Sequence, residues 1–280
     1  MMDDATDRPT AGRRPSEGYR PGPMGATGRS STRFVTEYEW LNEAFPEGIA
    51  VPSSIVISGP GGAGKPLIAL GVVASWLRAG GRVIVAPLQF PNPTFVSKTL
   101  RDLYDLDIAD YEDDVVHVRF DPDADGVVAG PDGQLRANLV QPESWTAVIE
   151  ETGLREDTGG PGVLWFSTAL NLPLFSPTHA DDLLDTVGDL FGSTAITWLF
   201  CVSTSMVAER AAALESLADT LIRSEVRDDP KRLQFDVERR DGDPVSSDPI
   251  DAPFDPSTLS TIEDRSDRYK VVPNERIRQL

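Results

Sequence analysis

Ser54-Ile55-Val56-Ile57-Ser58 leads directly into Gly59-Pro60-Gly61-Gly62-Ala63-Gly64-Lys65, and this stretch decides the fold. The first five residues are apolar at the centre and rich in β-branched side chains, as in a strand buried on both faces of a parallel sheet. Glycines then free the backbone to turn, and a helical pattern runs from Lys65 to Ala79. A glycine loop between strand and helix lets backbone N–H groups converge on an anion. The sequence therefore predicts a loop that binds phosphate groups.

The spacing of Gly59, Gly64 and Lys65 matches G-x-x-x-x-G-K-[ST], the P-loop motif. In this motif the lysine meets the β- and γ-phosphates of a nucleotide. A glycine-rich turn without a ligand does not explain a lysine at this place in a chain that has only four. We expect ATP or another nucleotide as the cofactor, bound by Gly59, Gly61, Gly62, Ala63, Gly64, Lys65, Pro66 and Leu67.

Position 66 departs from the motif, which places serine or threonine there to hold Mg²⁺. Pro66 has no hydroxyl to reach the ion and no N–H to aim at a phosphate. Proline is favourable in the first turn of a helix, so the fold survives the change even where the chemistry does not. Magnesium binding is therefore doubtful.

Six more apolar runs follow the loop, bounded by turn residues. The predicted strands are residues 82–86, 115–120, 163–167, 196–202, 220–226 and 232–239, and the predicted helices are residues 65–79, 92–104, 142–152, 179–191 and 206–217. Strands that alternate with helices of this length favour right-handed crossovers and a mostly parallel sheet covered on both faces. The last two strands flank Asp228-Asp229-Pro230, which indicates a β-hairpin. The predicted fold is three-layer α/β with a C-terminal hairpin.

The two ends of the chain differ in composition from this domain, which spans residues 33–245. Residues 1–32 are rich in Pro, Gly, Ser, Thr and Arg, with almost no large apolar residue, so we expect a disordered tail. Residues 246–280 are rich in Pro, Asp and Ser and should form an extension that lies over the surface and is partly disordered. A length of 280 residues suits one such domain.

The chain is strongly acidic, with 45 acidic residues, 26 basic residues and a formal net charge of −19. Such a surface repels itself at low salt, whereas at molar salt the screening length falls to about 3 Å. We therefore interpret the protein as halophilic. The same charge makes nucleic acid an unlikely partner, because phosphate neutralisation needs clustered Lys and Arg.

The single cysteine, Cys201, lies in an apolar run, where we expect a buried thiol. No stretch approaches the roughly 20 apolar residues that span a bilayer, and the N-terminus is polar. These features predict a cytoplasmic protein without a membrane segment.

Both ends of the domain carry a resemblance to a known family. Before the first strand stand Trp40-Leu41-Asn42-Glu43-Ala44-Phe45, Gly48 and Val51-Pro52-Ser53-Ser54, and after the last helix stand Leu217-Ala218-Asp219-Thr220-Leu221-Ile222, Arg232-Leu233-Gln234-Phe235 and Arg239-Arg240-Asp241-Gly242. Together with the P-loop, these residues resemble the RecA-like ATPases, most closely their KaiC-like branch, over about residues 33–242. The resemblance implies a RecA-like P-loop domain and a homo-oligomer, a ring or filament, in which Arg239 and Arg240 contact a neighbour's nucleotide. A solvated strand end is the favoured interpretation of this pair.

Two further departures from the family fall on its chemistry. Where the resemblance implies a Walker B aspartate, the strand ends in Ser167 and Thr168, of which Ser167 is a weak candidate metal ligand. Where it implies a general-base glutamate, the sequence has Gln89, which could orient a water but cannot accept its proton. Because phosphoryl transfer depends on metal, lysine and positioned water, these losses predict degenerate Walker motifs with little or no hydrolysis.

Other candidate sites are weaker. Asp121, Asp123 and Asp125, with Asp132, match the spacing of a calcium loop, but a strand precedes them and a solvated acidic loop running to Gln141 is favoured. The two histidines, 117 and 179, have no second His or Cys at metal spacing and should be structural. The hydroxyls of residues 203–205 have no His or Asp partner for nucleophilic chemistry.

Three functions remain open. The favoured one is a degenerate KaiC-like protein that binds a nucleotide and acts on an unidentified protein partner in regulation or signal transduction. The second is an active Mg-dependent ATPase whose metal site uses Ser167, Thr168 or an aspartate from elsewhere. The third is an interaction scaffold whose loop binds no nucleotide.

Overall fold

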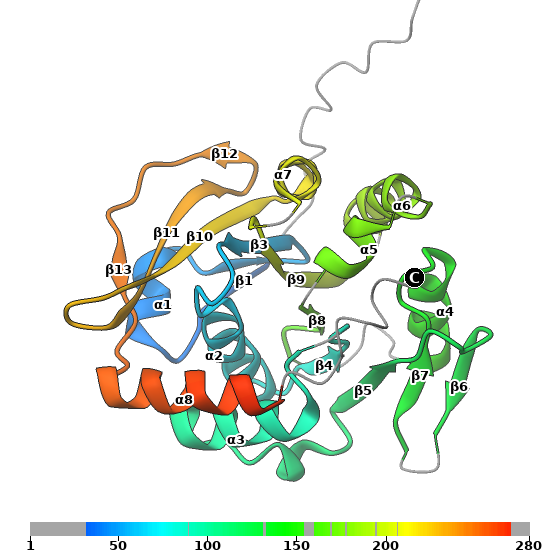
Figure 1. Ribbon diagram of the computed structural model, residues 1–280, viewed down its shortest axis with the longest axis horizontal. Coiled ribbons are helices and arrows are strands. Elements are labelled where there is room, and N and C mark those ends of the chain that lie inside the picture. Colours follow the sequence, from blue (N-terminus) through cyan, green and yellow to red (C-terminus); the bar gives the residue numbers. More distant parts are fainter. Residues whose placement is uncertain are drawn as a thin grey trace, which may run out of the picture. The chain divides into compact units, whose positions relative to one another are not determined.

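The computed structural model describes residues 32–88, 90–130, 133–153, 160–168, 170–176, 178–193, 195–205 and 207–269. Within them an 11-stranded mixed sheet, most of whose neighbouring pairs are parallel, forms the centre of an α/β fold (Figure 1). From edge to edge the order is β12 (Asp243–Pro244), β11 (Arg232–Arg240), β10 (Thr220–Arg227), β3 (Ser54–Gly59), β9 (Ile196–Ser203), β8 (Val163–Ser167), β4 (Arg82–Val85), β5 (Val115–Phe120), β7 (Leu135–Ala137) and β6 (Val127–Ala129), with β13 (Ile250–Asp251) paired to β11.

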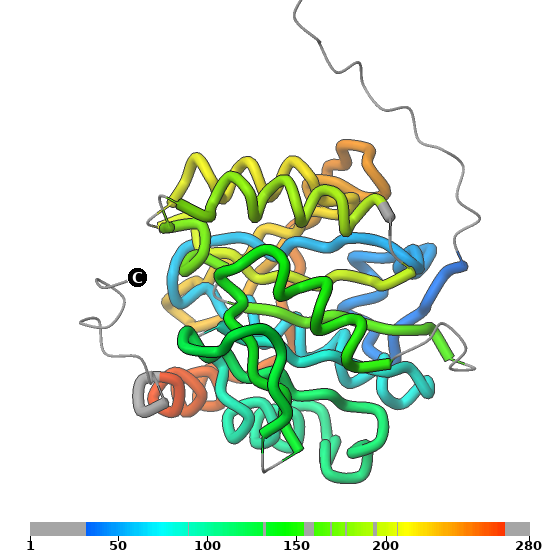
Figure 2. Tube along the Cα trace, turned by 90° about the vertical axis from the view of Figure 1, so that its right-hand side faces the viewer, coloured from blue at the N-terminus to red at the C-terminus, as the bar shows by residue number. Residues whose placement is uncertain are grey.

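Helices cover both faces of the sheet. They are α1 (Glu39–Ala44), α2 (Lys65–Arg78), α3 (Pro93–Tyr104), α4 (Glu143–Thr152), α5 (Asn171–Phe175), α6 (Ala180–Ser193), α7 (Ala208–Leu217) and α8 (Pro256–Tyr269), with a 3₁₀ turn at Ile108–Tyr111. Figure 2 shows α6 and α7 running side by side over one face. The expectation of an α/β domain with a mostly parallel sheet is confirmed.

Two hydrophobic cores lie on the two faces, and strand alternation divides the side chains between them. Ile55 and Ile57 of β3 enter the core formed with α1, α2, α3 and α8, whereas Val56 enters the core formed with α4 to α7. The strands therefore show continuous apolar runs, because both faces of each are buried.

Strand β3, which leads into the glycine-rich loop at residues 59–65, lies inside this sheet. It pairs in parallel with β10 on one side and with β9 on the other, and Gly59 is opposite Ser203 at the carboxyl end. In open α/β sheets, ligands bind beyond the carboxyl ends of the strands. The loop that follows β3 therefore lies at the edge where a ligand is expected.

The predicted C-terminal hairpin is confirmed. β10 and β11 pair antiparallel, with Arg227 opposite Arg232 at the turn. Short strands β12 and β13 then pair with β11 at that edge.

The acidic segment after β5 contains regular structure that the sequence did not indicate, so the expected loop from Asp121 to Gln141 is wrong. β7 pairs in parallel with β5, and β6 pairs antiparallel with β7, extending the sheet by two strands. Each of these strands is only three residues long, and Asp and Gly residues surround them. Such short runs show no strand pattern in the sequence.

The ends of the domain are more ordered than composition indicates. At the N-terminal end, Thr32 begins β1 (Thr32–Phe34), which pairs with β2 (Ile49–Val51), whereas residues 1–31 lie outside the described part. In the C-terminal extension, α8 places Leu259 and Ile262 in the core, and Lys231 forms an ion pair with Glu263. The extension thus lies over the surface of the domain as far as Tyr269.

Among the described residues, no helix combines the length and apolar character needed to cross a membrane.

Candidate phosphate-binding site

The candidate phosphate loop, residues 59–65, joins β3 to α2 and is open to solvent at Pro60, Gly61 and Gly62. Gly64 has a left-handed backbone with φ +66°, and a Cβ there would lie 2.7 Å from Leu233 Cδ1. A Cβ on Gly59 would lie 2.1 Å from the carbonyl oxygen of Ser224. Glycine is therefore required at both positions, because β10 and β11 press directly against the loop.

Lys65 lies beneath this loop with only 7% of its surface exposed. Its Nζ donates to the carbonyl oxygens of Gly59 at 3.0 Å and Pro60 at 2.5 Å. Burial lowers the pKa of Lys65 to about 8, although the nearby Cys201 thiol acts in the opposite direction. Among the described residues, the ammonium group donates to neutral carbonyls alone, so an anion would be a better partner for it.

The backbone N–H groups of the loop are only partly engaged. Gly61 donates to Ser205 Oγ at 2.9 Å, and Ala63 donates to the Pro60 carbonyl at 3.3 Å. The N–H groups of Gly62 and Gly64 donate to no residue that the structure describes. These free donors belong to the same loop as Lys65, and an anion-binding nest is built from backbone N–H groups of this kind.

The helix beyond the loop offers fewer donors. Pro66 stands in the first turn of α2 and has no N–H. Leu67, an expected cofactor contact, is buried, its N–H donates to Gly64 O at 2.8 Å, and its carbonyl accepts from the Tyr104 hydroxyl. The donor set therefore ends at Lys65.

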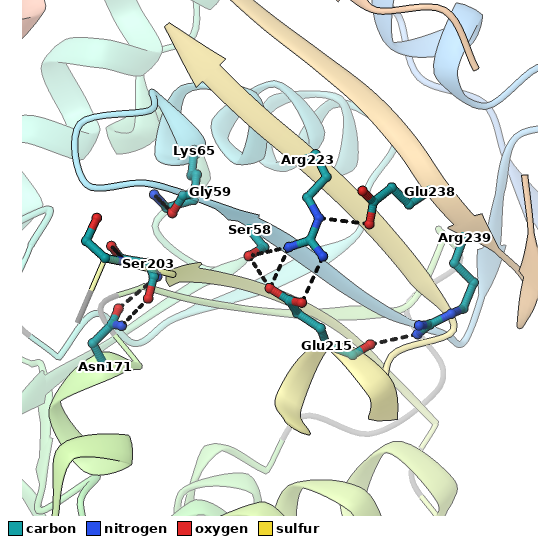
Figure 3. A network of polar contacts seen from close by, with 10 residues as sticks. Ser58, Gly59, Lys65, Asn171, Ser203, Glu215, Arg223, Glu238 and Arg239 are labelled. Carbon is teal, nitrogen blue, oxygen red and sulfur yellow. Dashed lines mark hydrogen bonds and ion pairs between the residues drawn. The ribbon is translucent and has the colours of Figure 1, made fainter. Parts of the chain in front are cut away.

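A segment of three hydroxyl residues, Ser203–Ser205, closes one side of the loop. The N–H of Thr204 donates to Gly59 O at 3.0 Å. The Asn171 amide clamps Ser203, donating to its carbonyl at 2.5 Å and accepting from its N–H at 2.8 Å (Figure 3). Sequence reasoning missed these contacts, because they join residues far apart in the chain that no motif connects.

An ion-pair network supports the loop from the other face of β3 (Figure 3). Arg223 of β10 forms a two-pronged pair with Glu215 of α7, at 2.6 and 2.9 Å, and its Nε donates to Glu238 at 2.8 Å. Ser58, which directly precedes the loop, donates to the buried Glu215 carboxylate and accepts from Arg223. The network fixes three strands and a helix around the loop, and it occupies the Glu215 carboxylate.

The candidate metal and catalytic residues are not gathered at the loop. Ser167 is fully buried on β8, which β9 separates from β3, and its hydroxyl donates to Ala86 O at 2.6 Å. Thr168 likewise donates to the Phe90 carbonyl. Gln89 lies outside the described residues. The hydroxyls predicted as possible metal ligands are thus engaged by backbone oxygens.

The acidic segment does not join the site either. Asp121 caps the N–H of Asp123 at 3.1 Å and pairs with Arg136 at 3.5 Å, and Asp125 is exposed. Asp132 falls outside the description. In the described ranges, no three His, Cys, Asp or Glu side chains gather as a metal-ion site.

The remaining candidates have structural surroundings. Burial lowers the pKa of His117 and raises that of Cys201 to about 12, so the thiol is inert at neutral pH. Arg239 donates to the carbonyls of Glu215 and Ala218, and Arg240 donates to Ala44 O. The interpretation of these two arginines as a solvated strand end is wrong, because both are partly buried and bonded within the chain.

The fold and the loop together define a class: an α/β domain with a glycine-rich loop that contains a buried lysine at the carboxyl edge of its sheet. No protein-family model matches the chain, and no curated protein matches it significantly.

Proposed function

We propose that this protein binds the phosphate of a nucleotide in the loop at residues 59–65 and acts in regulation or signal transduction with little or no ATP hydrolysis. The observation that carries the proposal is the pairing of unengaged N–H groups at Gly62 and Gly64 with a buried lysine held only by carbonyls. An anion would satisfy all three groups at once, since donors to a charged acceptor form the stronger hydrogen bonds.

The groups around the loop favour binding without turnover. Hydrolysis of ATP by such a loop uses a metal held by a hydroxyl and a carboxylate, with a positioned water. Here Pro66 has no hydroxyl and Ser167 is committed to a backbone carbonyl. Binding without turnover suits a protein that signals its nucleotide state to a protein partner, and membership of the RecA-like, KaiC-like ATPases is part of this proposal.

The experiment is thermal unfolding in molar KCl with AMP, ADP and ATP, each with EDTA and with Mg²⁺. We expect stabilisation without metal, since binding to the folded state at about 100 times Kd adds about 2.7 kcal/mol. Lys65→Ala should abolish it, whereas Lys231→Ala, which removes a lysine that forms an ion pair with Glu263 of α8, should not.

The other functions give different results. Stabilisation only with Mg²⁺, together with ATP turnover of about 1 per second that Lys65→Ala abolishes, would establish an active ATPase instead. No stabilisation by any nucleotide would indicate an interaction scaffold.

A further inference from the structure

The hydroxyl of Ser205 accepts a hydrogen bond from a backbone N–H group that the phosphate loop would otherwise offer to its ligand. Its Oγ accepts from the N–H of Gly61 at 2.9 Å. A Cβ built on Gly61 would lie 3.7 Å from that oxygen and 3.9 Å from Ser203 Oγ, so both hydroxyls stand against this glycine. The protein thus supplies its own oxygen at the position where a phosphate oxygen would bind.

Ser205 is held there by its surroundings, although its own side chain is exposed. Its N–H donates to Ser203 Oγ at 3.4 Å, and Ser203 is clamped by the Asn171 amide through two hydrogen bonds. The N–H of Thr204 joins the same segment to Gly59 O. The contact with Gly61 is therefore a consequence of how β9 ends.

The loop lacks a free backbone donor at both of its ends. Ser205 takes the Gly61 donor at one end, and Pro66 has no donor at the other. Between them remain the backbone N–H groups of Gly62, Gly64 and Lys65, which donate to no residue that the structure describes, and the Lys65 ammonium group. These donors suffice for the oxygens of one phosphoryl group. A longer polyphosphate would find no backbone donors for its additional oxygens.

The charge of the loop also favours a ligand with a single phosphoryl group. Lys65 is the single cation of the loop, and the nearby Arg223 is committed to Glu215 and Glu238. Without a metal, a polyphosphate chain brings several negative charges to a protein whose net charge is already −19. A singly phosphorylated ligand matches one ammonium group far better.

We propose that Ser205 is a specificity-determining residue that restricts the loop to a single phosphoryl group, either inorganic phosphate or the phosphate of a nucleoside monophosphate. This inference rests on the proposed function, because it assumes that the loop binds an anion. Beyond the proposed function, the inference names the anion that the loop selects and the side chain that makes the selection.

The test is calorimetric titration of the full chain with inorganic phosphate, AMP, pyrophosphate and ADP, in EDTA and at fixed ionic strength. We expect the wild type to prefer phosphate over pyrophosphate and AMP over ADP. Ser205→Ala frees the Gly61 N–H and should raise the relative affinity for pyrophosphate and ADP about tenfold, the value of one added hydrogen bond to a charged group. Comparing AMP with phosphate shows whether the nucleoside contributes.

Two variants sharpen the result. Asn171→Ala, which releases the Ser203–Ser205 segment, should shift the ratio in the same direction by a smaller factor. Ser216→Ala removes an exposed hydroxyl that bonds only within α7, and it should leave the ratio unchanged.

An unchanged ratio in Ser205→Ala, or weaker binding of every anion, would overturn the inference while leaving anion binding by the loop intact; weaker binding throughout would mean that the hydroxyl itself contacts the ligand. If neither the wild type nor Ser205→Ala binds any of the four anions, the proposed function fails and this inference fails with it.

Discussion

Lys65 is a buried cation held by carbonyl oxygens, and its protonation should affect folding. Burial lowers its pKa from 10.5 to about 8, so between these pH values the unfolded chain binds more protons than the folded chain. The free energy of unfolding should therefore rise with pH across this window, by at most about 3 kcal/mol. In Lys65→Met this contribution is absent.

Urea unfolding of the wild type and of Lys65→Met, at pH about 7 and about 10, isolates the effect, because other titrating groups contribute equally to both proteins. Parallel pH profiles of the two proteins would show that Lys65 does not carry the shift.

Substitutions at two glycines of the candidate phosphate loop distinguish the cost of steric crowding from the cost of backbone strain. At Gly59 a Cβ would collide with the Ser224 carbonyl at 2.1 Å, whereas at Gly62, with φ +81°, it would meet nothing within 4 Å. Gly62→Ala should cost about 1 to 2 kcal/mol, the strain of a left-handed residue. Gly59→Ala should cost about 3 kcal/mol or more in urea unfolding, because backbone must move. Similar losses in the two variants would contradict the close packing of β10 on the loop.

At the level of elements, the ion pair between β10 and α7 should stabilise the structure around the loop. Arg223→Ala leaves the Glu215 carboxylate buried with Ser58 as its remaining side-chain partner. We expect a loss of about 3 kcal/mol in the free energy of unfolding, the lower end for breaking a buried pair, because about a third of the arginine is exposed.

Arg227→Ala on the same strand is the matched control. Its ion pair with Glu225 is solvent-exposed on both sides, so its removal should change stability by no more than about 0.5 kcal/mol. Equal effects of the two substitutions would mean that the Glu215 network is no more important than a surface pair.

The elements that were predictable share one physical property. Buried parallel strands such as β3, β8 and β9 form unbroken apolar runs. Helices α2, α3 and α4 begin at Pro or polar residues, so local sequence sufficed to predict these elements. Helix α8 was not predictable because only Leu259 and Ile262 among its described side chains are buried. Strands β6 and β7 were not predictable because each is only three residues long.

At the scale of the whole molecule, the loop could be predicted but its surroundings could not. The motif at residues 59–65 specifies local geometry, and the loop lies where the motif placed it. The contacts of Gly61 with Ser205 and of Ser58 with Glu215 join residues separated by 144 and 157 positions. Only the folded sheet brings such residues together, so no spacing in the sequence could indicate them.

The net charge of −19 acts on the molecule as a whole, and it should make stability depend on salt. Repulsion among exposed carboxylates opposes folding, and molar KCl reduces the screening length to about 3 Å. The thermal midpoint should therefore rise with KCl, and with choline chloride at equal ionic strength. Asp185 and Asp189, both exposed and one helical turn apart on α6, offer a local test of this effect.

Asp185→Asn combined with Asp189→Asn removes a like-charged pair that costs about 0.2 to 0.5 kcal/mol at low salt. The double variant should be more stable than the wild type in dilute buffer and equal to it in molar KCl, because the screened wild type no longer suffers the repulsion. Thermal unfolding across a KCl series measures both midpoints. If the advantage of the variant persists at molar salt, or the wild-type midpoint does not rise with KCl, charge repulsion is not what limits the stability of this fold.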